Sequence, residues 1–150
     1  MEISKYMNRI TWEEYALRIA EVAAQRSEDV WMKVGACVLD KNNMVLGVGY
    51  NGLAPNKNVE SKFWEDRDHR RKFMLHAEAN CLSMIKRGDG NLLACTLLPC
   101  SSCATLIAAN GIKKVVYREL YNRDTSAIEI FDFYNIECLK IASGAQSKTI

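Results

Sequence analysis

The 150-residue sequence predicts a single α/β domain, and three observations support this prediction. Short apolar runs of strand length alternate with segments whose apolar residues recur at helical spacing. The second half of the chain follows the order strand, helix, strand, helix, strand, which is typical of parallel strands joined by crossover helices. The length suits one domain with a sizeable core, and no stretch is typical of an interdomain linker.

The first predicted element is a helix over residues 11–26. The sequence Thr11-Trp12-Glu13-Glu14 has the pattern of a capping box, in which Thr11 accepts from the backbone and Glu14 reaches back to it. Apolar residues then recur at helical spacing, at Trp12, Ala16, Ile19 and Ala23.

Two apolar runs, residues 34–39 and 44–50, flank the turn sequence Lys41-Asn42-Asn43 and predict a β-hairpin. Residues 51–75 are polar, and they predict a long loop that ends in a helical segment. The mixed-charge run 65–72 in this loop is interpreted as a solvated face rather than as a binding surface.

The remaining elements complete the alternating pattern. We expect a second capping box at Ser126-Ala127-Ile128-Glu129 and a frayed tail over residues 142–150. The predicted elements are a helix over 76–87 stopped by Gly88, a strand over 92–98, a helix over 100–110 ended by Gly111, a strand over 113–117, a helix over 126–134 and a strand over 136–141.

Composition excludes several classes of protein. The net charge of +2 does not favour a protein that coats nucleic acid, so no nucleic-acid partner is expected. No apolar run approaches the ~20 residues that a membrane span requires, so no membrane association is expected. The polar, mixed-charge N-terminus is unlike a signal peptide, and a reducing, cytoplasmic location is therefore expected.

The six cysteines fall into two groups. Cys37, Cys81, Cys95 and Cys138 lie in apolar stretches and are predicted to be small core residues. Cys100 and Cys103 are three residues apart at a predicted helix start, so their thiols face the same way. Together with His76 they supply three metal ligands and leave a fourth tetrahedral position open, which is typical of a catalytic zinc.

Glu78 lies two residues from His76 and gives this cluster a proton carrier. A carboxylate beside zinc-activated water suits the hydrolytic removal of an amino group from an amidine-like carbon. One alternative is a structural zinc with a fourth ligand such as His69 or another cysteine. Another is that the four residues are unrelated and bind no metal.

The spacing His-x-Glu followed by Pro-Cys-x-x-Cys resembles the zinc nucleobase deaminases. Further matches resemble the deoxycytidylate deaminase branch of the cytidine/deoxycytidylate deaminase family, and the resemblance covers residues 10–141. They are Ala24-Gln25-Arg26-Ser27, Val34-Gly35-Ala36-Cys37, Gly49-Tyr50-Asn51-Gly52, His76-Ala77-Glu78-Ala79-Asn80 and Gly111-Ile112-Lys113. The resemblance implies the cytidine deaminase-like three-layer fold, a mixed five-stranded sheet with helices on both faces.

The resemblance also implies an activity and a cofactor. It implies that His76, Cys100 and Cys103 hold one catalytic Zn²⁺ and that Glu78 is the proton shuttle. The implied reaction converts dCMP to dUMP and ammonia by attack of zinc-activated water on C4 of cytosine. Deamination of dCTP, or of both phosphate forms, is an alternative, and a catalytically silent zinc- or nucleotide-binding regulatory module is another.

Four residues are candidate substrate contacts. Asn51 matches an asparagine that contacts sugar and base, although a turn residue is the alternative. Arg26 is the candidate for the phosphate and Tyr121 for the sugar and phosphate, with ordinary surface roles as alternatives. Ala77, between ligand and shuttle, completes the set. For Trp31 and Trp64, packing or loop anchoring is favoured over a role as walls of the base pocket.

The loop after Asn51 departs from the family pattern, because Leu53 and Ala54 precede Pro55. This departure argues against regulation by dCTP and dTTP. Residues 53–75 contain no cysteine and only His69, so no second, structural zinc is expected. Relatives form closed homo-oligomers, and a hexamer is expected here. The apolar segments 106–109 and 128–134 could form its contacts, although core packing is the default interpretation of both.

Overall fold

The computed structural model describes residues 8–143, and its elements follow the predicted order. The largest difference in bounds is in the helix after His76, which ends at Leu82 rather than at residue 87. The elements are α2 (Trp12–Ala24), β1 (Gly35–Asp40), β2 (Val45–Tyr50), η1 (Ser61–Glu65), α3 (Arg67–Arg70), α4 (Ala77–Leu82), β3 (Gly90–Leu97), α5 (Ser101–Ala109), β4 (Lys114–Glu119), α6 (Ser126–Phe133) and β5 (Glu137–Lys140).

The five strands form one mixed sheet in the order β2-β1-β3-β4-β5. β1 pairs antiparallel with both β2 and β3, so the predicted hairpin is confirmed. β3, β4 and β5 pair in parallel, and α5 and α6 form the crossovers between them. The expected mixed five-stranded sheet is therefore confirmed.

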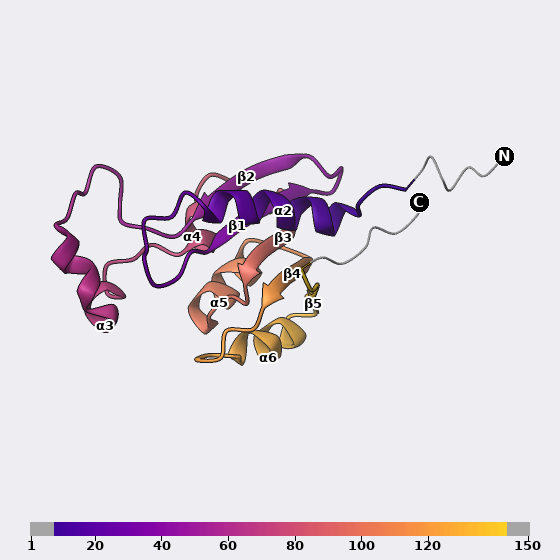
Figure 1. The fold of residues 1–150 in the computed structure, drawn as a ribbon. Coiled ribbons are helices and arrows are strands. Elements are labelled where there is room, and N and C mark those ends of the chain that lie inside the picture. The colour runs from indigo at the N-terminus through magenta and orange to yellow at the C-terminus, as the bar shows by residue number, and fades with distance from the viewer. Residues whose placement is uncertain (1–7, 144–150) are drawn as a thin grey trace.

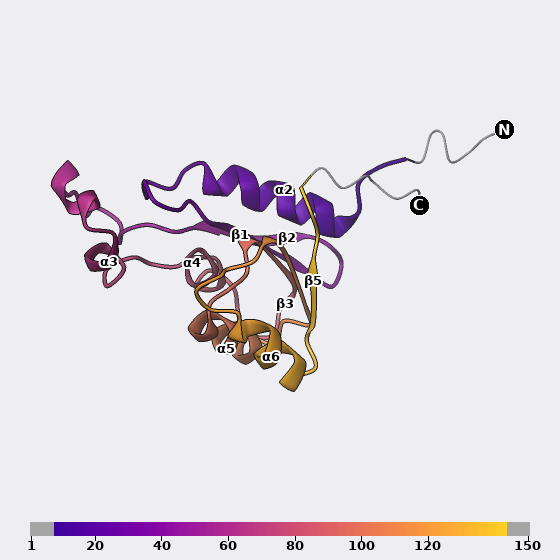
Figure 2. The same cartoon turned by 60° about the horizontal axis from the view of Figure 1, so that its bottom comes forward.

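Helices cover both faces of this sheet and make a three-layer structure (Figures 1 and 2). α2 lies on one face, where its buried alanines and Leu17 pack against Cys37 and Leu39 of β1. α4, α5 and α6 lie on the other face, and their buried side chains belong to one apolar cluster with Ala36 and Val38 of the same strand. Alternate residues of β1 thus enter two separate apolar clusters, as the two-residue period of a strand requires.

The start of α2 follows half of the predicted capping box. The Thr11 hydroxyl accepts from the Glu14 backbone N–H at 3.1 Å, as expected. The Glu14 side chain does not reach back, because it is buried beneath the helix and its carboxylate accepts from Arg118 Nη1 at 2.9 Å. Trp12, which was expected on the apolar face, is half exposed, and Leu17 and Ala20 take the buried positions.

The capping box predicted at Ser126 is wrong. Thr125 is the N-cap of α6, and its side chain makes no capping hydrogen bond. The Ser126 N–H instead donates to Asp124 Oδ1 at 3.0 Å, and the Ser101 N–H donates to Asp124 Oδ2 at 2.8 Å. One carboxylate therefore joins the first turns of α5 and α6, and these bonds lower the pKa of Asp124 to about 2.

Residues 53–75 extend away from the sheet and carry η1 and α3, and we name them the arm (Figure 1). The predicted long loop with a helical segment is confirmed. An isolated antiparallel bridge closes the neck of the arm, with Gly52 N–H donating to Leu75 O at 3.1 Å and Leu75 N–H donating to Gly52 O at 2.7 Å. Inside the arm, the rings of Phe63, His69 and Phe73 contact one another.

The predicted frayed tail falls mostly on residues 144–150, which lie outside the described residues. At its beginning, the Ala142 carbonyl accepts from Arg118 Nη1 at 3.2 Å. None of the helices in residues 8–143 combines the length and apolar character needed to cross a membrane.

Candidate active site

The three predicted metal ligands meet where α4 and α5 begin. His76 is the N-cap residue of α4, Cys100 is the N-cap residue of α5, and Cys103 lies in the first turn of α5. The His76 Nδ1 atom lies 3.2 Å from Cys103 Sγ and 3.5 Å from Cys100 Sγ. All three ligand atoms lie within 4.8 Å of one another.

These residues fit a tetrahedral zinc ion. Zinc bonds of ~2.1 Å to nitrogen and ~2.3 Å to sulfur place the two ligand atoms roughly 3.6 Å apart at a tetrahedral angle. The observed N–S separations of 3.2 and 3.5 Å are close to that value. The neighbouring Cys103 thiol and the His76 ring lower the pKa of Cys100, and the same contact with Cys100 raises the pKa of Cys103.

The alternative of a structural zinc requires a fourth protein ligand beside this cluster. In the described part of the chain, the cluster of possible metal ligands contains His76, Cys100 and Cys103 and no fourth residue. His69 lies in the arm and packs its ring against Phe63 and Phe73. A structural zinc with His69 as fourth ligand therefore has no support in the geometry.

Glu78 is held beside the ligands by the close contact of α4 with β2. A Cβ atom built on Gly49 would lie 2.6 Å from the Ala77 carbonyl oxygen, so only glycine allows this approach. Asn80 Nδ2 donates to the Tyr50 carbonyl at 2.9 Å and fixes the helix along the strand. The Glu78 carboxyl is buried, and burial raises its pKa, as suits a group that must take up and return a proton.

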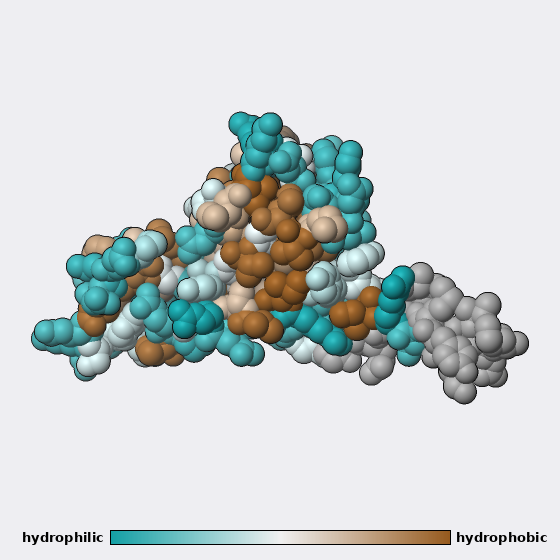
Figure 3. Space-filling model, turned by 90° about the horizontal axis from the view of Figure 1, so that it is seen from above, coloured by the Kyte–Doolittle hydropathy of each residue, from teal (hydrophilic) through white to brown (hydrophobic). Residues whose placement is uncertain are grey.

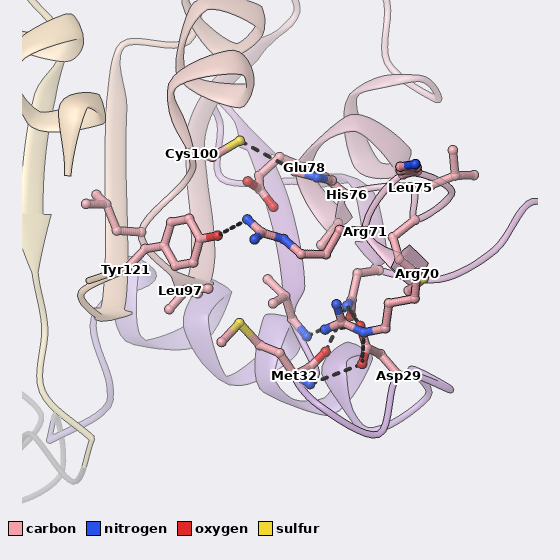
Figure 4. Close-up of a pocket in the computed structure, with 16 residues that line it drawn as sticks. Asp29, Met32, Arg70, Arg71, Leu75, His76, Glu78, Leu97, Cys100 and Tyr121 are labelled. Atoms are coloured by element: carbon pink, nitrogen blue, oxygen red, sulfur yellow. Dashed lines mark hydrogen bonds and ion pairs between the residues drawn. The ribbon is translucent and has the colours of Figure 1, made fainter. Parts of the chain in front are cut away.

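His76, Glu78 and Cys100 line one cavity with a volume of about 420 Å³, a size typical of small-molecule sites (Figure 4). Three of the predicted substrate contacts, Asn51, Ala77 and Tyr121, line it as well. Its wall is completed by side chains from the loop after α2, the arm and the end of β3: Asp29, Met32, Val34, Arg70, Arg71, Lys72, Met74, Leu75, Leu97 and Leu98.

Asn51 organises the wall on the side of the loop after α2. Its Oδ1 accepts from the Val34 N–H at 2.8 Å, and its Nδ2 donates to the Met32 carbonyl at 2.8 Å. Asn51 does not take a positive φ, whereas Asn43 in the hairpin turn does, at 63°. The alternative interpretation of Asn51 as a turn residue of that kind is therefore not supported.

Arg26 is the predicted contact that the structure does not bring to this cavity. Its exposed side chain lines a second hollow between α2 and β2, together with Tyr15, Arg18 and Val48. The expected phosphate contact and the metal ligands thus lie at different hollows of the described chain.

Three cations among the cavity residues, Arg70, Arg71 and Lys72, were not predicted as site residues from the sequence. The interpretation of the run 65–72 as a solvated face holds for Arg71 and Lys72, which are exposed although they line the cavity, and is wrong for Arg70, which is buried. A usable signal was their position four to six residues before His76, since so short a connection keeps them near the metal ligands. Trp31 and Trp64 do not line the cavity, and Trp31 Nε1 donates to the Trp64 carbonyl at 2.7 Å, in agreement with loop anchoring.

Comparison with known proteins agrees with this geometry. Residues 10–119 match the family model for the cytidine and deoxycytidylate deaminase zinc-binding region. The chain is 40% identical over 125 residues to the deoxycytidylate deaminase of Mycobacterium phage D29, covering 74% of this chain and 97% of that protein. It is 34% identical over 120 residues to the deoxycytidylate deaminase of Mus musculus, covering 72% of this chain but only 65% of that longer protein.

One solved structure shares both the fold and a related sequence with this chain. The dCMP deaminase of cyanophage S-TIM5, in complex with dCMP and dUMP, superposes with a TM-score of 0.73 at 34% identity. The match covers 85% of this chain and 95% of that one. The chain therefore belongs to the cytidine and deoxycytidylate deaminase family.

Proposed function

We propose that this chain catalyses the hydrolytic deamination of dCMP to dUMP and ammonia. The observation that carries the proposal is the shared cavity, in which a buried carboxyl faces a His-Cys-Cys ligand set that fits zinc. The substrate class is supported by the relatives named deoxycytidylate deaminase and by the phage dCMP deaminase solved with dCMP and dUMP.

His76, Cys100 and Cys103 would hold the zinc ion, which when bound lowers the pKa of a coordinated water from 15.7 towards ~7. Glu78 accepts a proton from the attacking water and delivers it to N3 of the cytosine ring. It then takes the second water proton and delivers it to the 4-amino group. The C4–N4 bond breaks, ammonia leaves, and a carbonyl oxygen remains on C4.

The cavity residues suggest how the substrate is oriented. Ala77 lies between a metal ligand and the shuttle, and its small side chain leaves the cavity open to the cytosine ring. Asn51 shapes the wall through its bonds to Val34 and Met32. Tyr121 stands across the cavity from Asp29 and Arg70 (Figure 4). The position of Arg26 in the second hollow gives no support to its role as a phosphate contact within one copy of the chain.

The proposal is tested by ammonia release from the purified zinc-loaded protein. We expect turnover of dCMP, and zinc-loaded, folded protein that releases no ammonia from dCMP would overturn the proposal. The same assay with dCTP distinguishes a dCMP deaminase from the alternative, an enzyme that deaminates dCTP or both nucleotides. A catalytically silent module is disfavoured because the buried Glu78 carboxyl is retained beside the ligands, where a binding module has no use for it.

We also propose that the protein is a cytoplasmic homo-oligomer, with a hexamer as the expected form. β2 is an edge strand, and α2 and β2 carry exposed apolar side chains, including Val22, Val45 and Val48. Figure 3 shows apolar side chains gathered on the face seen from above. Phe133, at the end of α6, is 76% exposed, so the segment 128–134 also offers a contact. Light scattering that reports a monomer at micromolar concentration would contradict this assembly.

We propose that dCTP and dTTP do not regulate the enzyme, because the loop after Asn51 departs from the family pattern. The expected result is an unchanged rate of dCMP turnover when either triphosphate is added at saturating concentration. A change of tenfold or more in the KM for dCMP would contradict it.

A further inference from the structure

The cavity wall carries three cations from the arm, and their charges are not equally balanced. Arg70 pairs with the buried Asp29 carboxylate, with 3.1 Å between Nη2 and Oδ2. Arg71 and Lys72 line the same cavity, but in the described part of the chain neither has a carboxylate within hydrogen-bonding distance. The nearest approach is 3.9 Å, between Arg71 Nη1 and the 82% exposed Asp68 side chain. The wall therefore presents unbalanced positive charge.

Arg71 is directed across the cavity by a neutral partner. Its Nη2 donates to the Tyr121 hydroxyl oxygen at 3.0 Å, and Figure 4 shows this bond reaching from the arm to the far side of the cavity, next to Glu78. Because the hydroxyl accepts from Arg71, its own hydrogen remains able to donate. An anion beside this pair would receive charge-assisted bonds from the remaining N–H groups of the guanidinium and a bond from the Tyr121 hydroxyl.

We propose that Arg71, assisted by Tyr121, recognises the 5′-phosphate of the nucleotide and thereby sets the preference for a nucleotide over a nucleoside. This inference rests on the proposed function, since it names how that same site selects its substrate. A guanidinium presents N–H donors in a planar fork that matches two phosphate oxygens, so it can bind the phosphate and fix its orientation. Lys72 adds a second positive charge on the same wall.

Arg70 serves this recognition as a positioning residue. Its Nε donates to Asp29 Oδ1 at 3.1 Å, which attaches the arm to the loop after α2. Its Nη1 donates to the Arg67 carbonyl at 2.8 Å, so the guanidinium also fixes the backbone of α3. Arg71 follows directly in the chain, so this anchoring also fixes the backbone from which the partly exposed Arg71 side chain reaches the cavity.

The chain contains a closely matched control for Arg71. The Arg71 and Arg123 side chains are 46% and 45% exposed, and the Nη1 atom of each lies 3.9 Å from the same Asp68 oxygen. Arg71 lines the cavity, whereas Arg123 does not. Arg71→Gln and Arg123→Gln each remove one positive charge of nearly equal exposure. Only the charge of Arg71 lies on the cavity wall.

The experiment measures kcat and KM of the zinc-loaded enzyme on dCMP and on deoxycytidine. For Arg71→Gln we expect kcat/KM on dCMP to fall about 10- to 100-fold, mainly through KM, because charge-assisted bonds to the phosphate are lost. The loss on deoxycytidine is much smaller than the loss on dCMP, so the ratio of kcat/KM for dCMP to that for deoxycytidine falls, and Arg71→Lys gives an intermediate loss on dCMP. Arg123→Gln changes neither substrate by more than about twofold.

A binding measurement keeps this test independent of turnover. Calorimetry with dUMP and deoxyuridine gives the affinity ratio of nucleotide to nucleoside, which we expect Arg71→Gln to reduce by the same factor. An unchanged ratio, or an equal reduction in Arg123→Gln, would overturn the role of Arg71. Wild-type protein that binds dUMP more tightly than deoxyuridine but deaminates neither cytosine substrate would overturn the proposed function and leave the phosphate site supported.

Discussion

Arg70 and Asp29 form a buried ion pair with two bonds, Nε to Oδ1 and Nη2 to Oδ2, each 3.1 Å long. The two residues are 41 positions apart, and their side chains are 6% and 3% exposed. The same carboxylate accepts from the Trp31 N–H at 2.8 Å and the Met32 N–H at 3.2 Å. A single aspartate thus holds the loop after α2 and the arm together on one side of the cavity.

Replacing Arg70 by methionine leaves Asp29 buried without its cation. Removing one partner of a buried pair costs about 3–5 kcal/mol, so we expect a loss of this size in the free energy of unfolding, measured by urea denaturation. Arg67→Met is the matched control on the same helix, because Arg67 stacks over the Trp31 ring at 5.6 Å and we expect a loss below about 1 kcal/mol. Equal losses in the two variants would contradict the importance of the pair.

Glu78→Gln preserves the size of the side chain and removes its ability to carry a proton. We expect zinc content to stay at one ion per chain and kcat to fall by about 10²- to 10⁴-fold, the contribution of a general acid–base group. Zinc is measured by atomic emission and turnover by ammonia release. Glu129→Gln on the exposed side of α6 is the control and should keep full turnover. Comparable rates in the Glu78 variant and the wild type would exclude the shuttle.

Cys100→Ala tests the ligand set. The variant keeps His76 and Cys103 but loses one of three ligands, so we expect less than one zinc per chain after dialysis and little dCMP turnover. Cys138→Ala removes a half-buried cysteine of β5 outside the cluster and should retain one zinc. Chelation of the wild type should abolish turnover, and added Zn²⁺ should restore it. Zinc retained at full occupancy by Cys100→Ala would contradict the assignment.

The ionisation of Glu14 is expected to account for part of the dependence of folding stability on pH. Hydrogen bonds from the buried Arg118 guanidinium hold the pKa of Glu14 below its ordinary value, so the folded state favours the carboxylate. The stabilisation is therefore complete above the unfolded pKa, roughly 4.3, and is lost as the pH falls through the lower folded pKa. Glu14→Gln should lose about 2–4 kcal/mol at pH 7 and show a smaller further loss between pH 5 and 3.

Urea unfolding of chelator-treated protein at several pH values checks this prediction, since removing the metal excludes acid release of zinc as the cause. Glu129→Gln, which changes an exposed carboxylate, should follow the wild-type profile. A Glu14→Gln profile parallel to the wild type at all pH values would show that Glu14 does not contribute to the acid transition.

The metal cluster could be predicted from sequence because its information is local. Cys100 and Cys103 lie within one helical turn, and Glu78 is two residues from His76, so spacing alone indicates the chemistry. The order of strands and helices was also predictable, because the periods of burial differ between them. These local patterns determine which residues share an element and a face.

The residues that line the rest of the cavity could not be predicted in the same way. The ion pair between Arg70 and Asp29 orients residues 65–72 relative to the cavity. The local pattern of apolar and polar residues gives no information about a pair between residues so far apart in the chain. Glu14 shows the same limit, since its local capping pattern is overridden by Arg118, 104 residues away. Arg26 was predicted at the phosphate because a guanidinium just after the first helix can bind an anion, but it lines the second hollow, between α2 and β2.

The closed neck of the arm has a consequence for how this enzyme can evolve. Because Gly52 and Leu75 bond to each other, the two ends of the arm are already joined, and a longer or shorter arm leaves the sheet unchanged. Each doubling of a flexible loop costs only about 0.6 kcal/mol in closure entropy. With the roles proposed above, natural selection can exchange the segment that carries Arg71, and with it the choice of substrate, while His76, Glu78 and the cysteines keep the chemistry constant.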